Sequence, residues 1–277
     1  MTKISLVTDS TCDLPDNLVE KHNIHVVPNL IIIQGQEYQD GKGISRQEFY
    51  ERLPAMSSPP TTATASSGTY QQLYEDLLRL GSTKIISIHA ASTLSGIFNA
   101  AQTAAHAFHE HVLVIDSGQI SLGLGFQVLE AAEAIEQGAN FERLIEFLGK
   151  IRERIRVMAM LDTLEYVRRS GRVSWMSAHL GNLMQIKLFL EVKAGEVLRS
   201  GEARTRRKGI ERLIQHLMQL GPLQRLAILH TNARDEAQQI LIEINPKLPT
   251  SPLVVNVTTV IGAHVGPNGL GFAAVLA

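Results

Sequence analysis

Short apolar runs alternate with amphipathic stretches along the first half of the chain. The runs Ile4–Thr8, Lys84–His89 and Val112–Asp116 are rich in isoleucine and valine, which is typical of buried strands. Strands that alternate with helices in this way predict a parallel sheet in a layered α/β fold. The predicted helices cover about 15–22, 45–53, 68–79, 94–108 and 119–137, and a further strand covers His25–Ile33.

The second half of the chain mixes its elements. Asn140 is expected to cap a helix that reaches Arg154, and two apolar segments around Ala194-Gly195 predict a β-hairpin. We therefore expect two domains: an N-terminal, Rossmann-like α/β/α domain with a parallel sheet over residues 1–155, and a C-terminal mixed-sheet α/β domain over residues 156–277. The other predicted elements are strands at 156–161, 226–230, 253–259 and 272–276, and helices at 164–169, up to about 180, 206–220 and 234–244.

Polar residues stand at the ends of three predicted strands of the first half. They are Asp9-Ser10-Thr11, the segment from His89 to Ser95, and Asp116-Ser117. In open α/β sheets, ligands bind outside the carboxyl ends of the strands. The three polar ends therefore predict one shared binding cleft.

Composition narrows the class of protein. The 277 residues are 44% hydrophobic and 19% charged with a net charge of −1, which supports a substantial core and argues against a broad nucleic-acid-binding surface. The single cysteine, Cys12, can form no internal disulfide, which fits a reducing compartment. Because no apolar run approaches the roughly 20 residues of a transmembrane helix, the simplest expectation is a soluble cytoplasmic protein.

Motifs for cofactors and metals are missing from the sequence. It contains no GxxxxGK[ST] loop and no GxGxxG turn between a strand and a helix, and it has neither an HExxH motif nor a pair of cysteines. His106, His109 and His111 cluster at a predicted helix end, where solvated side chains are the favoured interpretation. No cofactor and no metal are expected.

Three hydroxyl- or imidazole-bearing segments are candidates for ligand contact. Ser95 lies in "STLSG", which lacks the first glycine of a nucleophile elbow and is expected to fall in the first turn of a helix. Thr62 belongs to the loop "PPTTATASSG", and His264 belongs to the glycine-rich stretch 262–271, where a sharp turn is expected. Taken one at a time, a helix cap, a surface loop and a buried histidine remain the simpler interpretations.

The densest positive run is "ARTRRKG", which includes Arg204 and Arg206 at the start of a predicted helix. Cations at a helix N-terminus oppose the helix dipole, at about 0.3–1 kcal/mol each. The run is therefore either an exposed group of charges or a docking patch.

Six motifs, in order, resemble the signatures of the DegV family from the first strand to the last. They are "VTDSTCDLP", "LSGIFNAA", "VIDSGQISLGLG", "RRSGRVS", "LEVKAGEV…ARTRRK" and "IGAHVGPNGLG". The resemblance implies a two-domain DegV-like fold and a bacterial protein that binds a long-chain fatty acid, such as palmitate, between its domains without catalysis of its own. It also implies a partner, an ATP-dependent fatty acid kinase subunit that converts the presented acid to acyl-phosphate for phospholipid synthesis.

The resemblance also implies roles for individual residues. The hydroxyls of Thr62 and Ser95 and the imidazole of His264 match the family's carboxylate ligands, and Gly96 and Arg172 match positions near the ligand mouth. Arg204 and Arg206 match the segment that docks the kinase. Two departures stand out: Thr62-Ala63-Thr64-Ala65-Ser66 replaces a common threonine-serine-glutamine-proline-serine loop, and Ile97-Phe98 replaces threonine and tyrosine.

Two other classes of function remain open at this point. One is a hydrolase or acyltransferase that uses Ser95 and His264 on a bound lipid. The other is a nucleic-acid regulator that binds through the patch Arg204–Lys208, which the near-zero net charge disfavours.

Overall fold

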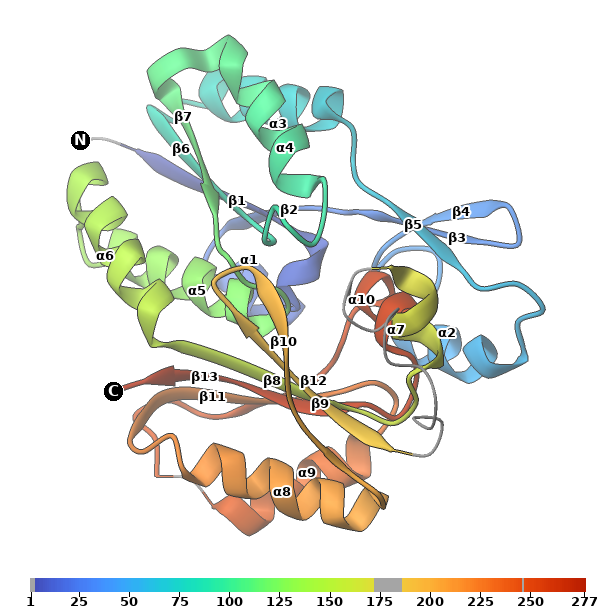
Figure 1. Cartoon of the computed structure of the whole chain (residues 1–277). Coiled ribbons are helices and arrows are strands. Elements are labelled where there is room, and N and C mark those ends of the chain that lie inside the picture. The colour runs from blue at the N-terminus through green and yellow to red at the C-terminus, as the bar shows by residue number, and fades with distance from the viewer. Residues whose placement is uncertain (1–2, 172–185, 246) are drawn as a thin grey trace.

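The first half of the chain forms a four-stranded parallel sheet with the strand order β2-β1-β6-β7 (Figure 1). The structure is a computed structural model that describes residues 3–171, 186–245 and 247–277. The strands are β1 (Ile4–Asp9), β2 (Ile24–Val27), β6 (Lys84–His89) and β7 (Val112–Asp116). The accompanying helices are α1 (Asp16–Lys21), α3 (Ser67–Arg79), α4 (Ile97–Ala105) and α5 (Leu122–Glu136), with short 3₁₀ turns at Ser10–Cys12 and His106–His111.

The second half forms a six-stranded mixed sheet with the strand order β10-β9-β8-β13-β11-β12. Only β11 and β12 pair in parallel, and the other neighbours are antiparallel. Helices α8 (Arg206–Met218) and α9 (Arg234–Ile244) cover one face, while α5 and α6 (Phe141–Arg154) lie on the opposite side (Figure 1). The strands are β8 (Ile155–Leu161), β9 (Lys187–Lys193), β10 (Glu196–Ala203), β11 (Leu223–His230), β12 (Leu253–Asn256) and β13 (Leu270–Leu276).

A third, antiparallel sheet with the order β4-β3-β5 was not predicted. The single strand expected at 25–33 is wrong, because the chain leaves the parallel sheet after Val27 and begins β3 at Leu30. Pro28 lacks the N–H that would continue the ladder, and the backbone N–H of Asn29 donates instead to Ser10 Oγ at 3.1 Å. This sheet comprises β3 (Leu30–Ile33), β4 (Gln36–Gln39) and β5 (Thr61–Ala63), and it lies beside α2 (Arg46–Arg52) and a 3₁₀ turn at Leu53–Ala55.

Two short helices, α7 (Glu165–Ser170) and α10 (Thr259–Val265), pack against each other near the third sheet (Figure 1). The strand predicted over 253–259 ends at Asn256, and α10 follows it. His264 therefore lies in the last turn of a helix, and the expectation that it lies in a glycine turn is wrong. The turn begins only at Gly266, whose φ of 81° suits glycine.

Helix α5 is the layer shared by both large sheets. It contacts β1 and β6 of the first sheet and β8 and β13 of the second. A Cβ atom on Gly125 would overlap the carbonyl oxygen of Cys12, so only glycine lets the helix lie this close. One hydrophobic core consequently runs through both halves. The chain enters the second sheet at Ile155, but a domain boundary near this point stays a prediction.

None of the described helices is long and apolar enough to cross a membrane.

Candidate functional site

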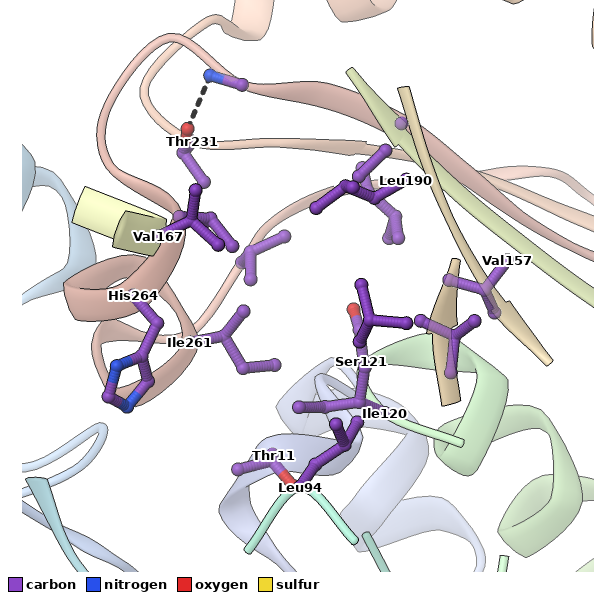
Figure 2. A pocket seen from close by; sticks show the side chains of 18 of the residues that line it. Thr11, Leu94, Ile120, Ser121, Val157, Val167, Leu190, Thr231, Ile261 and His264 are labelled. Atoms are coloured by element: carbon purple, nitrogen blue, oxygen red, sulfur yellow. Dashed lines mark hydrogen bonds between the residues drawn. The ribbon is translucent and has the colours of Figure 1, made fainter. Parts of the chain in front are cut away.

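A largely apolar cavity lies between the loops at the carboxyl ends of the parallel strands and one face of the six-stranded mixed sheet. Its volume is about 180 Å³, measured as the space open to the centres of water molecules. Figure 2 shows side chains from both halves of the chain pointing into it. Those labelled there include Leu94, Ile120, Val157, Val167, Leu190 and Ile261.

The carboxyl ends of the parallel strands supply the floor of this cavity, as predicted. The loops after β1, β6 and β7 contribute Thr11, Ser95 and Ser121 to the lining. The acidic residues at the strand ends do not take part, because Asp9 and Asp116 bond to neighbouring loops instead. Two carboxylates expected near the cleft are therefore used to hold the loops in place.

Thr62 and His264 form a hydrogen-bonded pair at one edge of the cavity. Thr62 Oγ1 and His264 Nε2 lie 3.0 Å apart, although the residues are 202 positions apart in the sequence. Thr62 lies in β5 and His264 in α10, and both side chains are partly buried. An imidazole and a hydroxyl in this arrangement offer hydrogen bonds to a carboxylate.

Ser95 lines the same cavity but lies two residues before α4, not inside its first turn. Its hydroxyl accepts a weak hydrogen bond from the N–H of Ile97 at 3.4 Å. Gly96 caps α4, and a Cβ atom there would lie 3.9 Å from the side chain of Thr64. The structure thus brings the Ser95 loop beside the threonine loop, and it places Thr62, Ser95 and His264 around one cavity.

The outer side of the Thr62–His264 pair faces a second pocket, whose lining includes the exposed residues Pro59 and Thr61. This pocket has a volume of about 240 Å³ on the same measure and is lined by both residues together with Tyr166, Arg169 and others. The pair therefore separates an apolar inner cavity from a more polar outer pocket. A ligand with an apolar chain and one polar end fits this arrangement.

A buried polar cluster fixes the helix that carries His264. The N–H of Thr258 donates to Asp13 Oδ1 at 2.8 Å, and the hydroxyl of Thr259 donates to Asp40 Oδ1 at 2.7 Å. Burial raises the pKa of Asp13 to about 6, although Arg46 lies 3.2 Å from its carboxylate. Nothing in the sequence pattern singled out this cluster, because its members are isolated polar residues in separate elements.

The buried ring of Tyr50 explains why position 262 of α10 is a glycine. Tyr50 is fully buried, and its hydroxyl donates to the carbonyl of Val257 at 2.9 Å. A Cβ atom on Gly262 would overlap the Tyr50 ring, so glycine lets α10 lie directly on this ring.

A fully buried histidine, His89, belongs to a separate cluster that does not line the cavity. His89 Nδ1 lies 3.0 Å from Asp9 Oδ2, and His89 Nε2 lies 2.7 Å from Ser87 Oγ. All three side chains are fully buried. The sequence predicts that the segment from His89 to Ser95 lies at the cleft, but the His89 ring is buried in the core and does not line the cavity.

The two basic candidates differ in their surroundings. Arg204 is exposed, as expected, whereas Arg206 is partly buried and bound to Asp162 and Glu236. Arg172, which is predicted near the ligand mouth, lies outside the described residues. In the part of the chain that the structure describes, no group of three or more acidic, histidine or cysteine side chains could hold a metal ion.

Comparisons with known proteins agree on one family. The model of the DegV family, described as uncharacterised, matches residues 3–277. A DegV domain-containing protein of Staphylococcus aureus is 33% identical over 275 residues, covering 98% of each chain. The protein DegV of Bacillus subtilis is 32% identical over 275 residues, covering 97% of each chain.

Two solved structures are similar over the full length of both chains. One is a DegV family protein from Thermus thermophilus, described by its fatty acid binding, with 30% identity and a TM-score of 0.92. The other is DegV of Bacillus subtilis, described as a fatty acid binding protein, with 30% identity and a TM-score of 0.89. The α/β fold, with one parallel and one mixed sheet, is therefore that of these proteins.

Proposed function

The chain belongs to the DegV family, and we propose that it binds a long-chain fatty acid, such as palmitate, without catalysing a reaction on it. The acyl chain lies in the apolar cavity, and the carboxylate lies at Thr62, Ser95 and His264. The observation that carries this proposal is an apolar cavity that ends at a hydrogen-bonded threonine–histidine pair. The described fatty acid binding of the two similar structures supports it.

The acyl chain supplies most of the affinity in this proposal. Each buried methylene contributes about 0.8 kcal/mol, so about 14 of them contribute roughly 11 kcal/mol before the costs of ordering. A hydrogen bond to a charged carboxylate contributes about 1.5–3 kcal/mol. The polar residues therefore fix the direction in which the acid lies, and the cavity holds it.

The test is the identity of the ligand that accompanies the purified protein. Solvent extracts analysed by mass spectrometry are expected to contain a long-chain fatty acid well above a blank, and delipidated protein is expected to take up added palmitate. Extracts without fatty acid, together with no uptake of palmitate, would rule the proposal out.

We further propose that the bound acid is presented to a separate, ATP-dependent fatty acid kinase subunit in the cytoplasm, which forms acyl-phosphate for phospholipid synthesis. The outer pocket beside Thr62 and His264 supports this, because it gives a partner access to the carboxylate end of the ligand. Arg204 is an exposed charge in the segment that matches the family's kinase-docking region. Such charges steer association.

The docking proposal is tested with Arg204→Glu, the cognate kinase, ATP and loaded protein. Acyl-phosphate formation is expected to fall while palmitate binding stays unchanged, because Arg204 is exposed and does not line the cavity. Equal rates for the native protein and the variant would overturn the docking role of Arg204.

The enzyme alternative receives no support from the site. A nucleophilic serine needs a base within hydrogen-bond reach, but the hydrogen bond recorded for the Ser95 hydroxyl comes from the backbone N–H of Ile97. Incubation with acyl esters tests this directly, since turnover that disappears in Ser95→Ala would identify a hydrolase.

A further inference from the structure

Arg206 makes four hydrogen bonds within its own chain. Its Nε and Nη2 atoms donate to the two carboxylate oxygens of Glu236 in α9, the Nε bond measuring 2.7 Å. Its Nη1 atom donates to Asp162 Oδ1 at 2.9 Å and to the carbonyl of Asn268 at 2.8 Å. Since a guanidinium has five N–H donors, little hydrogen-bonding capacity is left for a partner protein.

Two of these contacts hold the ends of the helices at the cavity mouth. Asp162 lies three residues before α7, and Asn268 lies three residues after α10. Helix α10 carries His264, and α7 carries Val167, which points into the cavity (Figure 2). One guanidinium group therefore joins the segment that enters α7 to the segment that leaves α10.

The two helices themselves are in close contact. A Cβ atom on Gly266, directly after α10, would overlap the ring of Tyr166 in α7. Val265 packs against the small hydrophobic cluster that includes Val167. A shift of one helix therefore has to move the other, which makes the clamp at their ends effective.

The loop after α10 is also held from the cavity side. The N–H of Gly269 donates to Thr231 Oγ1 at 2.6 Å, and Figure 2 shows this bond at the cavity wall. The N–H of Asn268 donates to the carbonyl of Thr231, also at 2.6 Å. The loop is thus fixed between Thr231 inside and Arg206 outside.

The charges around Arg206 are compensated internally. Glu236 and Asp162 each carry a carboxylate, and Lys187 also pairs with Asp162 at 2.6 Å. The hydrogen bonds with Glu236 raise the pKa of Arg206 further above its ordinary value, so the guanidinium stays charged. In contrast, Arg207 is 85% exposed and pairs only loosely, at 3.6 Å, with Glu211.

We propose that Arg206 is a positioning residue for the fatty-acid site, clamping α7 and α10 so that His264 faces Thr62 and the carboxylate. The part of this inference that concerns the ligand rests on the proposed function. The clamp itself is a property of the protein without ligand. A positive charge alone is insufficient for this clamp. Lysine lacks the planar guanidinium group with which Arg206 bridges Glu236, Asp162 and Asn268.

The experiment compares the full-length native protein with Arg206→Gln, Arg206→Lys and the neighbouring control Arg207→Gln. Three quantities are measured: amide hydrogen exchange of residues 266–269, the imidazole chemical shifts of His264, and the rate at which loaded protein releases palmitate to albumin. In Arg206→Gln we expect exchange and release to be about five- to ten-fold faster and the His264 shifts to change, within the usual range of coupling between sites. Arg207→Gln is expected to match the native protein in all three.

Arg206→Lys separates positioning from charge compensation. Resistance to chemical denaturation is measured as a fourth quantity, and we expect Arg206→Lys to recover it, because a cation again faces Asp162 and Glu236. Amide exchange, palmitate release and the His264 shifts are expected to stay altered in Arg206→Lys. Full restoration of all three by lysine, or native values in Arg206→Gln, would overturn the proposal. If the native protein takes up no palmitate, the proposed function fails, while exchange and imidazole shifts still decide whether Arg206 clamps the loop.

Discussion

Two histidines in this protein make nearly the same hydrogen bond in opposite surroundings. His89 Nε2 lies 2.7 Å from a serine hydroxyl, and His264 Nε2 lies 3.0 Å from a threonine hydroxyl. The other ring nitrogen of His89, Nδ1, lies 3.0 Å from Asp9 Oδ2, so Asp9, His89 and Ser87 are connected in the order of a hydrolase triad. The triad-like group is nevertheless sealed, since all three side chains are fully buried and Ser87 Oγ also bonds to the Tyr74 hydroxyl at 2.8 Å.

The comparison teaches that access, not hydrogen-bond order, distinguishes a site from a structural cluster. His264 borders both the inner cavity and the outer pocket, so a ligand can reach it. His89 holds a buried carboxylate in place: burial acts to raise the pKa of Asp9, but the interactions with His89 and Thr11 outweigh it and lower that pKa. His264 thus borders space that a ligand can enter, whereas His89 stabilises the fold.

Replacing His89 should give the largest change in stability. His89→Ala leaves the buried carboxylate of Asp9 without its partner, and breaking a buried pair in this way costs about 3–5 kcal/mol. Chemical denaturation measures the loss, with His264→Ala as the matched variant and an expected change below about 1 kcal/mol. Equal losses in the two variants would remove the distinction between them.

Filling the cavity should give the next largest effect, this time on binding. Ile120 points into the cavity from its floor (Figure 2), and Ile120→Trp would occupy space needed for about three or four methylenes. At about 0.8 kcal/mol each, their loss weakens palmitate binding by about 100-fold. The control is Ile145→Trp on the exposed side of α6, where binding should not change. Unchanged affinity in Ile120→Trp would place the acyl chain elsewhere.

A third histidine, His230, is buried like His89 and extends the comparison to the dependence of stability on pH. Among the residues that the structure describes, His230 has no carboxylate partner like Asp9. It accepts a hydrogen bond from the N–H of Ala233 at 3.3 Å, and burial, aided by Arg234 and Arg46, lowers its pKa to about 4. Below about pH 6.5 the unfolded chain takes up a proton that the folded protein excludes, so stability falls as the pH falls towards 4. The loss reaches about 2 kcal/mol at pH 5.

The variant His230→Asn isolates this effect, because asparagine can accept the same hydrogen bond without titrating. Its free energy of unfolding should fall less between pH 7 and pH 5 than that of the native protein. Asp13, whose raised pKa acts in the opposite direction, is present in both proteins and cancels in the difference. Parallel pH profiles would show that His230 is not held neutral by the fold.

Removing a single hydroxyl at the mouth should have the smallest effect. Thr62→Val deletes the hydroxyl that faces His264 but keeps the branched shape, and Ser95→Ala deletes the other hydroxyl. Each change should weaken palmitate binding only about ten-fold, the lower end for a hydrogen bond to a charged group. Isothermal titration with palmitate measures this, and an empty protein in either case would show that the acyl chain does not dominate affinity.

Local signals in the sequence determined much of the fold. Asn140 caps α6 through the N–H of Arg143, as predicted, and Ser45 caps α2, the helix predicted at 45–53, through the N–H of Glu48. The strands predicted at Lys84–His89 and Val112–Asp116 are β6 and β7. Caps and apolar periodicity are readable because they depend on residues within about one turn of each other. The six ordered motifs likewise sufficed to identify the family.

Only the tertiary structure decided which distant residues contact one another and where the cavity lies. Thr62 and His264 meet across 202 positions, and α10 forms where the sequence indicated a strand and a turn, because Tyr50, Asp13 and Asp40 hold it from other elements. The sequence could not reveal the cavity either, because side chains that line an empty space have the same composition as those that fill a core. Arg206 and Arg207 are neighbours in one basic run, yet Arg206 is partly buried and paired with Glu236, whereas Arg207 is exposed. Their difference follows from long-range contacts that packing fixes, which no local pattern encodes.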